Sequence, residues 1–313
     1  MKSDTGNMCL VSVMITTHNR AELVVNAINS VLNQTFKNYE LLIVDDASKD
    51  NTEEVVKTFL DRRIKYIKIS PEETKGGNHA RNVGIKEAKG EFIAFLDDDD
   101  EWMPEKLEKQ LEVFNKHKNA GFVYSGALWI NTERETEHEE FPLKRGNLSR
   151  EVLISNFVCS FSSVVVRKSK IEAAGLFDIK MPACQDYDMF IRVCQICEVD
   201  FVGEILVKYY SRSNFARIGC NVKKYESAYS LIEEKYNGLI SSLDKESEKK
   251  RKLAIYWMLS SYALDGGDFI RMKRYYRKFL SIKFDLKIFI KLCFAFVGIY
   301  DFRKIKRNFF LTR

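Results

Sequence analysis

Residues 90–102 read GEFIAFLDDDDEW, so a short apolar run at 92–96 leads directly into four aspartates at 97–100. The run has the length and the bulky residues of a buried strand. Four adjacent carboxylates repel one another, and a divalent cation would remove that cost. Mg²⁺ or Mn²⁺ takes one or two carboxylates together with substrate phosphates. A solvated acidic turn is the alternative, but the position after a strand and before Trp102 favours a site for a cation and a phosphate.

Other apolar runs extend this pattern over the first 125 residues. The sequences between them place apolar residues at helical spacing, as Val24, Ile28 and Val31 do. Strands that alternate with helices predict an α/β fold, with a twisted and mostly parallel sheet flanked by helices. Ligands of such sheets bind at the carboxyl ends of the strands. The predicted strands are CLVSVMIT (9–16), YELLIVD (39–45), IKYIKIS (64–70), EFIAFL (91–96) and GFVYS (121–125).

Polar residues follow the first two of these strands. Thr16 and His18 come where the first strand gives way to a helix, a position that suits a polar ligand or a phosphate. Asp45 and Asp46 end the second strand. Each motif alone is also a plausible turn or helix cap. Two strands of one sheet would nevertheless deliver these side chains to the same edge as the four aspartates.

Two further stretches carry candidate site residues. KGGNHARNVGI (75–85) lacks the spacing of a P-loop, but its Arg81 could pair with a diphosphate, or simply be a solvated surface arginine. In ACQDYDMFIRV (183–193) we expect Asp188 to pair with Arg192 one helical turn later. Asp186 has no such local partner, and it is therefore a candidate general base.

Composition excludes several classes of protein. With 313 residues, 45% hydrophobic and 30% charged, the chain is globular rather than disordered. Cys194 and Cys197 are closely spaced, but no second pair completes a zinc set, and we expect free buried thiols in a reducing cytoplasm. The N-terminus lacks the features of a signal peptide, and no window reaches the apolar length of a membrane span.

Charge divides the chain into a mildly acidic part and a strongly basic one. From residue 221 onward there are 21 Lys and Arg against 10 Asp and Glu, while residues 1–220 hold 29 against 34. Residues 271–313 mix cations with aromatic and apolar residues, which predicts either peripheral contact with an anionic membrane or a helical face packed on the core. No motif for nucleic acid accompanies them. We therefore expect a cytoplasmic protein, peripheral on the inner membrane face.

Taken in order, VSVMITTHNR, LLIVDDASKDNT, ARNVGI, GEFIAFLDDDDEW and QDYDMFIRV resemble the family 2 inverting glycosyltransferases of GT-A fold, over roughly residues 9–215. This fold is the nucleotide-diphospho-sugar transferase-like α/β fold. The resemblance implies a nucleotide-sugar-binding half at 1–125 and an acceptor-binding half with the catalytic base at 126–220. Residues 221–313 would be a basic, helical C-terminal region.

The resemblance also implies a role for each candidate residue. Asp99 would be the metal ligand of the Asp-x-Asp motif, for Mn²⁺ or Mg²⁺, and Asp186 the catalytic base. Asp98 and Asp100 would be supporting or solvated. The residues implied in binding the donor, through its base, ribose or diphosphate, are Thr16, His18, Asp46, Arg81, Asp97 and Arg212.

The implied reaction moves a hexose or N-acetylhexosamine from a UDP-sugar to a hydroxyl of a glycan or a lipid-linked glycan. Several positions depart from the family pattern, among them His18, where Tyr or Phe is frequent, and Glu73 or Thr74, near where an Asn is frequent. Ala47 replaces a common Gly, a minor change if the backbone there is ordinary, Gln185 replaces a Glu, and Arg212 stands where a His is frequent. The last two favour the alternative of a non-catalytic nucleotide- or glycan-binding module. A nucleotidyltransferase is disfavoured because TTHNRAEL lacks a glycine-rich loop.

Overall fold

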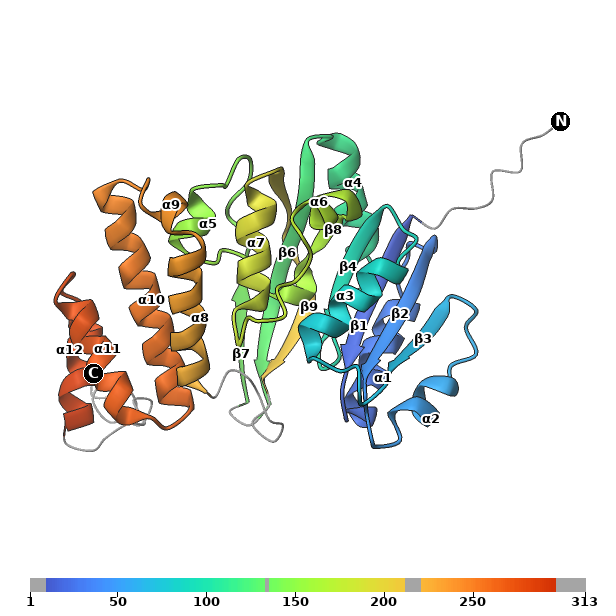
Figure 1. Ribbon diagram of the computed structural model, residues 1–313, viewed down its shortest axis with the longest axis horizontal. Helices are drawn as coiled ribbons and strands as arrows, with labels where there is room; N and C mark the ends of the chain where they lie inside the picture. Colours follow the sequence, from blue (N-terminus) through green and yellow to red (C-terminus); the bar gives the residue numbers. More distant parts are fainter. Residues whose placement is uncertain (1–9, 133–134, 212–220, 297–313) are drawn as a thin grey trace, which may run out of the picture. The chain divides into compact units, whose positions relative to one another are not determined.

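The computed structural model describes residues 10–132, 135–211 and 221–296 (Figure 1). The chain divides into two units, each described by itself. The sheet unit comprises Met1–Val152, Asn156–Lys180 and Gln185–Ser213, and the helical unit comprises Leu153–Ser155, Met181–Cys184 and Asn214–Arg313.

The sheet unit is built on a nine-stranded sheet. Eight strands follow the order β3-β2-β1-β4-β8-β6-β9-β5, and the ninth strand, β7, pairs with β6. Pairs among β1, β2, β3 and β4 are parallel, as is β6 with β9, whereas β8 runs antiparallel to both β4 and β6. The strands are β1 Val11–Thr17, β2 Tyr39–Asp46, β3 Ile64–Ile69, β4 Phe92–Asp97, β5 Glu101–Trp102, β6 Ala120–Asn131, β7 Thr136–Glu140, β8 Val165–Arg167 and β9 Glu198–Ser211.

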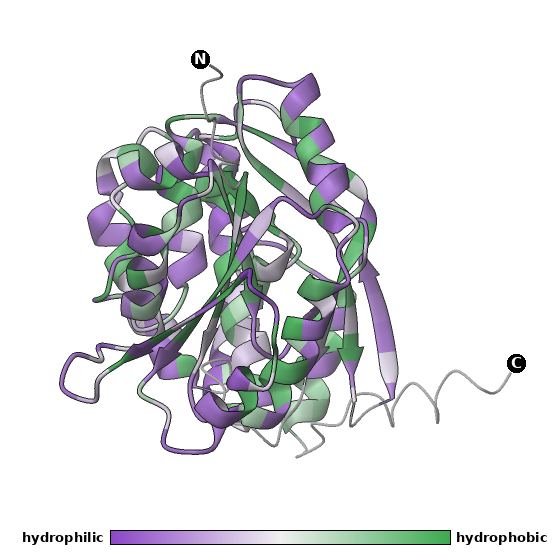
Figure 2. Ribbon diagram, turned by 90° about the vertical axis from the view of Figure 1, so that its right-hand side faces the viewer, coloured by the Kyte–Doolittle hydropathy of each residue, from purple (hydrophilic) through white to green (hydrophobic). Residues whose placement is uncertain are grey.

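Helices pack against this sheet, with α3 and α7 in front of it in Figure 1 and α1 behind it. Residues 92–96 of β4 are all buried, which requires cover on both faces of the strand. Figure 2 shows the hydrophobic residues gathered along the strands, with hydrophilic ones on the outer sides of the helices. The helices of this unit are α1 Ala21–Leu32, α2 Thr52–Lys57, α3 Gly77–Glu87, α4 Lys106–Lys116, the 3-10 helix η1 Phe161–Ser163, α6 Lys168–Ala173 and α7 Gln185–Cys194. The short helix α5 Glu151–Ile154 has residues in both units.

The amphipathic pattern explains α1. Leu23, Val24, Ala27, Ile28 and Val31 recur at helical spacing, and all five are buried in the structure. Burial of this stripe holds the helix that follows β1, and it therefore fixes the direction in which the intervening loop leaves the sheet.

Close approach between β1 and the start of β4 depends on Gly90. A Cβ at this position would lie 2.5 Å from the backbone nitrogen of Ser12 and 2.7 Å from the carbonyl carbon of Val11. The Gly90 N–H also donates a 2.9 Å hydrogen bond to Ser12 Oγ. A residue without a side chain therefore lets the aspartate-bearing strand enter the sheet in its register with β1.

The predicted α/β fold, with its sheet flanked by helices, is confirmed. The strands up to Asp97 are parallel as expected, and the later strands make the sheet mixed. Antiparallel β8 separates the parallel group of β1 to β4 from the parallel pair of β6 and β9.

The helical unit contains the predicted C-terminal helices, in which α10 packs on α8 and α11, and α11 packs on α12. The fully buried Arg251 pairs with Glu233 at 2.7 Å and donates to the Leu153 carbonyl, so this burial is compensated by charge and hydrogen bonds. Within the described part of the chain, no helix is long and apolar enough to cross a membrane. The helices are α8 Val222–Lys235, α9 Asn237–Ile240, α10 Lys245–Asp265, α11 Phe269–Leu280 and α12 Leu286–Phe296.

Candidate active site

The register of the parallel strands brings three polar strand ends to one rim. Thr16 is paired with Asp97 across β1 and β4, and Thr17 with Asp45 across β1 and β2. Neighbouring strands lie about 4.8 Å apart, so the ends of β2 and β4 are separated by about 10 Å. The candidate residues Thr16, Asp46 and Asp97 therefore lie along a single edge.

The loop after β1 is joined to the loop after β2 through His18 and Asn19. The Nδ1–H of His18 donates to the Asp46 carbonyl at 2.6 Å, and the Asn19 side chain lies 2.9 Å from Nε2. Asn19 also accepts from the Lys49 N–H at 2.7 Å. The carboxylate of Asp46 accepts a hydrogen bond from Thr74. Because both ring nitrogens are engaged, the imidazole is held at the rim in one orientation.

Three of the four aspartates are paired with arginines. Arg81 Nη2 lies 3.1 Å from Asp97 Oδ1, and Arg20 Nη1 lies 2.7 Å from Asp98 Oδ1 and 3.2 Å from Asp99 Oδ2. Burial raises the pKa of Asp98 to about 6, against the opposing effect of Arg20. Asp98 is 4% exposed, so it supports the loop from inside rather than facing solvent.

Asp100 is an interior anchor of the same loop. It is 1% exposed, accepts a 2.6 Å hydrogen bond from Ser162 Oγ, and accepts another from the Tyr210 N–H at 3.2 Å. Burial, with the neighbouring charges of Asp99 and Asp97, raises its pKa well above the usual range. Asp100 therefore fastens the aspartate loop to η1 and to the end of β9.

Arg81 is positioned by two aromatic rings. Its guanidinium lies 4.8 Å from the ring centroid of Phe161 and 5.7 Å from that of Phe177. Such contacts hold a cation over the ring face while its N–H groups remain free to point elsewhere. The Arg81 side chain is only 18% exposed, and its Nη2 group is already paired with Asp97.

Asp186 lies in the first turn of α7 and within the electrostatic reach of this pair. Burial raises its pKa, while Arg81 lowers it and Asp97 raises it. Arg81 and Asp97 therefore act on Asp186 electrostatically, although the aspartate loop is about 90 residues away in sequence. A half-buried carboxylate at a helix N-terminus, with a raised pKa, has the properties of a general base.

The rim thus gathers most of the predicted site residues. Thr16, His18, Asp46, Arg81, Asp97 and Asp99 lie on this edge, and Asp186 is within electrostatic reach of Arg81 and Asp97. Arg212 falls outside the described residues. The predicted pairing of Asp188 with Arg192 is confirmed, at 2.7 Å. The sequence reasoning missed Arg20, Ser162 and the Phe161–Phe177 pair.

A divalent cation fits the chemistry of the aspartate loop. Asp99 offers hard oxygen atoms and is 18% exposed, whereas its neighbour Asp98 is buried. No cluster of three or more His, Cys, Asp or Glu side chains able to hold a metal occurs among residues 10–132, 135–211 and 221–296. The partly exposed carboxylate of Asp99 could contribute one ligand to a cation that takes the others from phosphate and water, as Mg²⁺ typically does.

The sequence profile of Glycosyl transferase family 2 matches residues 12–175, the segment that carries β1, β2, β4 and the aspartate loop. The chain belongs to glycosyl transferase family 2. An uncharacterized glycosyltransferase of Rickettsia typhi is 30% identical over 324 residues, covering 100% of this chain and 97% of its own length. This family 2 protein is therefore a glycosyltransferase, as the sequence predicted.

Other relatives of this family 2 glycosyltransferase carry more specific names or are longer. The UDP-Glc:alpha-D-GlcNAc-diphosphoundecaprenol beta-1,3-glucosyltransferase WfgD of Escherichia coli is 44% identical over 122 residues, which cover 39% of this chain and 47% of WfgD. A matching glycosyltransferase of Rickettsia conorii is longer, and the match covers only 39% of its length.

Solved structures with the same fold include two enzymes with bound donors. Staphylococcus aureus TarS 1–349, in complex with UDP-GlcNAc, has a TM-score of 0.55 at 15% identity, and the match covers 87% of this chain and 89% of the TarS 1–349 chain. The mannosyltransferase PcManGT of Pyrobaculum calidifontis, in complex with GDP-Man and Mn²⁺, has a TM-score of 0.58 at 15% identity, over 95% and 83% of the two chains. At such low identity these neighbours establish the fold of this family 2 glycosyltransferase.

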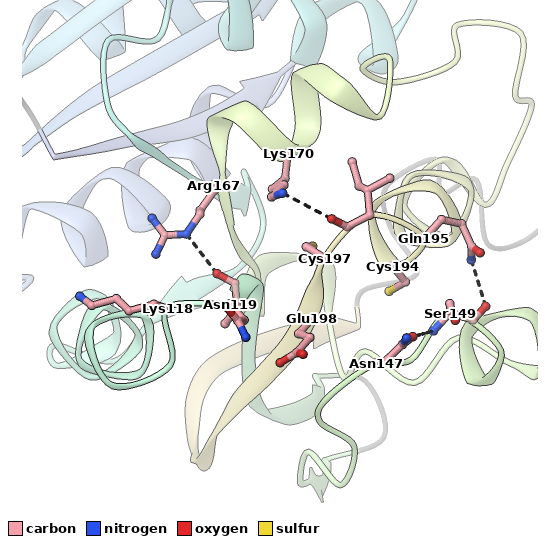
Figure 3. Close-up of a pocket in the computed structure, with 12 residues that line it drawn as sticks. Lys118, Asn119, Asn147, Ser149, Arg167, Lys170, Cys194, Gln195, Cys197 and Glu198 are labelled. Atoms are coloured by element: carbon pink, nitrogen blue, oxygen red, sulfur yellow. Dashed lines mark hydrogen bonds between the residues drawn. The ribbon is translucent and has the colours of Figure 1, made fainter.

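This family 2 glycosyltransferase has a separate pocket of about 550 Å³ at the end of the strands that lies away from the rim (Figure 3). It is lined where β6 and β9 begin and β8 ends, and it contains none of the predicted site residues. Its two thiols, Cys194 and Cys197, are free, and burial raises the pKa of Cys197 to about 11. Thiols that are protonated at neutral pH are weak nucleophiles, and both cysteines are free, as the sequence predicted.

The backbone at Ala47 is not ordinary, because this residue has a φ of +62°. Replacing Ala47 by Gly should raise the free energy of unfolding by about 0.5–1 kcal/mol, since the left-handed conformation costs alanine more than the added freedom of glycine in the unfolded chain. Denaturant unfolding measures the change. Ala88→Gly is the matched control, because Ala88 is equally buried but has a φ of −65°, and it should be destabilised. Equal destabilisation of the two variants would contradict the strain at Ala47.

Proposed function

We propose that this glycosyltransferase moves a hexose or N-acetylhexosamine from a UDP-sugar to a hydroxyl of a glycan or lipid-linked glycan, with inversion and with help from a divalent cation. The proposal is supported by the ion pairs that hold Asp97 and Asp99 on one rim and by Asp186, which lies within electrostatic reach of Arg81 and Asp97. These residues supply a base, a cation for phosphate and a metal ligand.

The donor would occupy the rim between the ends of β2 and β4. In this proposal Asp46 accepts a hydrogen bond from the uracil N–H, His18 and Thr16 line the same pocket, and Asp97 holds the ribose. Arg81 supplies positive charge beside the nucleotide, and its aromatic neighbours keep it there. Arg212 is a further proposed contact to the diphosphate.

The transfer needs one displacement. Asp186 takes the proton of the acceptor hydroxyl while that oxygen forms a bond to the anomeric carbon, and the bond from this carbon to the diphosphate oxygen breaks. Both bonding electrons leave with the nucleoside diphosphate. When bound at Asp99, a divalent cation would stabilise the charge that grows on the leaving phosphate. Attack from the face opposite the leaving group inverts the anomeric centre.

The relatives support the finer parts of this proposal. WfgD is named for a UDP-Glc donor and a diphosphoundecaprenol-linked acceptor, TarS was solved with UDP-GlcNAc, and PcManGT with Mn²⁺. We also propose that residues 1–125 bind the donor and that residues 126–220 bind the acceptor. Residues 221–313 are assigned to contact with the acceptor's membrane.

A panel of nucleotide sugars tests the function. Each is mixed with the enzyme, Mn²⁺ or Mg²⁺, and a lipid-linked or soluble sugar acceptor, and the released nucleoside diphosphate is measured. We expect release from a UDP-hexose or UDP-N-acetylhexosamine, and loss of that release on chelation. Release from GDP- or dTDP-sugars alone would reject the proposed donor, and release that survives chelation would reject the role of the cation.

The surface of α12 supports the proposed membrane contact. Ile288, Leu292 and Ala295 form its buried stripe, so these residues already face protein. A second apolar stripe is exposed, and we call it the α12 stripe: Leu286, Phe289, Ile290 and Phe296. Lys283 and Lys287 lie beside it and are exposed. An apolar stripe flanked by cations is complementary to the surface of an anionic bilayer.

Replacing Phe289 by Glu should weaken binding to vesicles of anionic phospholipid by at least about tenfold, because the change removes buried apolar area and adds repulsion. Cosedimentation with vesicles measures the affinity of the full chain. Leu60→Glu, which adds the same charge at a residue that is 96% exposed in the sheet unit, should bind like the wild type. Equal binding by the Phe289 variant and the wild type would reject the α12 stripe as the membrane contact.

A further inference from the structure

Arg20 connects the loop after β1 to the aspartate loop. It is the residue that precedes α1, and its Nη1 lies 2.7 Å from Asp98 Oδ1 and 3.2 Å from Asp99 Oδ2. The side chain is 24% exposed, against 5% for Asp98 and 18% for Asp99. One cation therefore bridges two adjacent carboxylates at the position where the proposed function requires a divalent cation.

The backbone on either side of Arg20 is fixed by the loop after β2. The Asn19 N–H donates to Ser48 Oγ at 2.8 Å, and the Ala21 N–H donates to Asp50 Oδ2 at 3.1 Å. Asn19 itself has a φ of +53°, so the chain turns sharply just before the arginine. These bonds aim the Arg20 side chain at the aspartate loop.

The two ion pairs of Arg20 are unequal. The pair with buried Asp98 is short, and breaking it would leave a carboxylate in the interior without its cation. The pair with Asp99 is 0.5 Å longer and lies nearer to solvent. An incoming cation would therefore compete with Arg20 for an oxygen of Asp99 more readily than for an oxygen of Asp98.

We infer that Arg20 is a resident cation of the aspartate loop that yields Asp99 to the divalent cation and then donates to a donor phosphate. This inference rests on the proposed function. Before the donor binds, Arg20 offsets the repulsion between Asp98 and Asp99 and keeps both carboxylates in place. Once Asp99 is engaged elsewhere, the guanidinium remains anchored on Asp98 with free N–H groups, in a geometry suited to phosphate oxygens.

A purely structural role for Arg20 predicts a different result. If the arginine only held the loop together, its removal would loosen the loop and weaken the binding of metal and nucleotide alike. A resident cation that competes with the metal and then contacts phosphate has opposite effects on the two ligands. Removing it strengthens metal binding and weakens nucleotide binding.

The test is calorimetric titration of wild type and Arg20→Gln with two probes, Mn²⁺ alone and UDP at saturating Mn²⁺. We expect the variant to bind Mn²⁺ about tenfold more tightly, because a competing charge is gone, and UDP about tenfold more weakly. Arg63→Gln is the matched control. This change also removes an arginine from an ion pair, in which Arg63 lies 2.6 Å from Asp61. Arg63 precedes β3, so it lies at the amino ends of the strands, away from the rim. Arg63→Gln should bind both probes like the wild type.

Each outcome has a separate meaning. Weaker binding of both probes by Arg20→Gln reduces the arginine to a structural role and overturns the inference, as does unchanged Mn²⁺ affinity. Arg20→Lys keeps the positive charge without the paired N–H groups. It should bind Mn²⁺ with nearly the wild-type affinity, but it should bind UDP as weakly as Arg20→Gln does. The Mn²⁺ titration needs no activity, so an enzyme that fails to use UDP-sugars would reject the proposed function without deciding the role of Arg20.

Discussion

Replacing Asp186 by Asn is expected to lower kcat by about 10²- to 10⁴-fold, the usual contribution of a positioned general base. Asparagine has nearly the same shape but cannot take the proton of the acceptor hydroxyl. Binding of UDP with Mn²⁺ should stay within about twofold of wild type, since Asp186 faces the acceptor in the proposed mechanism. Single-turnover transfer and calorimetric titration measure the two quantities. Glu172→Gln, an exposed carboxylate on α6, is the control and should retain full activity.

The pH dependence of this reaction follows from the raised pKa of Asp186. Burial is the main cause of the increase, with Arg81 opposing it and Asp97 adding to it. A base works only when deprotonated, so kcat should fall as the pH drops through this raised pKa, above the range of an ordinary aspartate. The small residual rate of Asp186→Asn should lack that acidic limb. An identical pH profile in the two proteins would show that another group titrates.

The raised pKa of Asp186 also predicts how folding stability depends on pH. Deprotonation favours catalysis, but it lowers stability. The folded protein binds the Asp186 proton more tightly than the unfolded chain, so this residue costs stability as the pH rises from the unfolded pKa through the folded one. The cost is fully present at pH values above the folded pKa, and Asp186→Asn removes it. The variant should therefore melt at a higher temperature than wild type at pH 7, and the difference should shrink toward pH 4. An inactive variant with raised stability cannot owe its inactivity to misfolding.

Much of the rim was predictable because strand ends are local features of the sequence. The apolar runs before Thr16, Asp46 and Asp97 have strand length, and parallel pairing necessarily brings their carboxyl ends to one edge. The existence of α7 was visible from its apolar periodicity. Its arrival within electrostatic reach of Asp97 was not, because that depends on tertiary packing across about 90 residues, and here the family resemblance supplied the role of Asp186.

The missed features share a physical cause, since each is a contact between distant segments. Arg20 stands within the quoted motif VSVMITTHNR, yet its partners are 78 and 79 residues away. Asp100 was expected to be supporting or solvated, and its burial results from hydrogen bonds to Ser162 and to the Tyr210 backbone. The left-handed conformation of Ala47 also had no signal in its own identity, because alanine rarely adopts it.

Replacing Asp99 by Ala should lower kcat/KM by about 10²- to 10³-fold, because the leaving diphosphate would lose much of the electrostatic stabilisation of its growing charge. Unlike the Asp186 variant, this one should also lose affinity for Mn²⁺, and UDP should bind more weakly at a fixed Mn²⁺ concentration. Raising the Mn²⁺ concentration should then recover part of the activity. Glu105→Gln removes an exposed carboxylate nearby and is the control, with no change expected.

The contrast between the two variants assigns the roles on the rim. Asp99 lies 3.2 Å from Arg20 and on the loop that would meet the diphosphate, whereas Asp186 lies on α7 within electrostatic reach of Arg81. Loss of Mn²⁺ affinity in the Asp99 variant, with unchanged Mn²⁺ affinity in the Asp186 variant, would separate metal binding from proton transfer. Wild-type Mn²⁺ affinity and wild-type turnover in Asp99→Ala would exclude this residue as the metal ligand. The cation would then have to bind through another group, with Asp97 the nearest remaining carboxylate of the Asp-x-Asp motif.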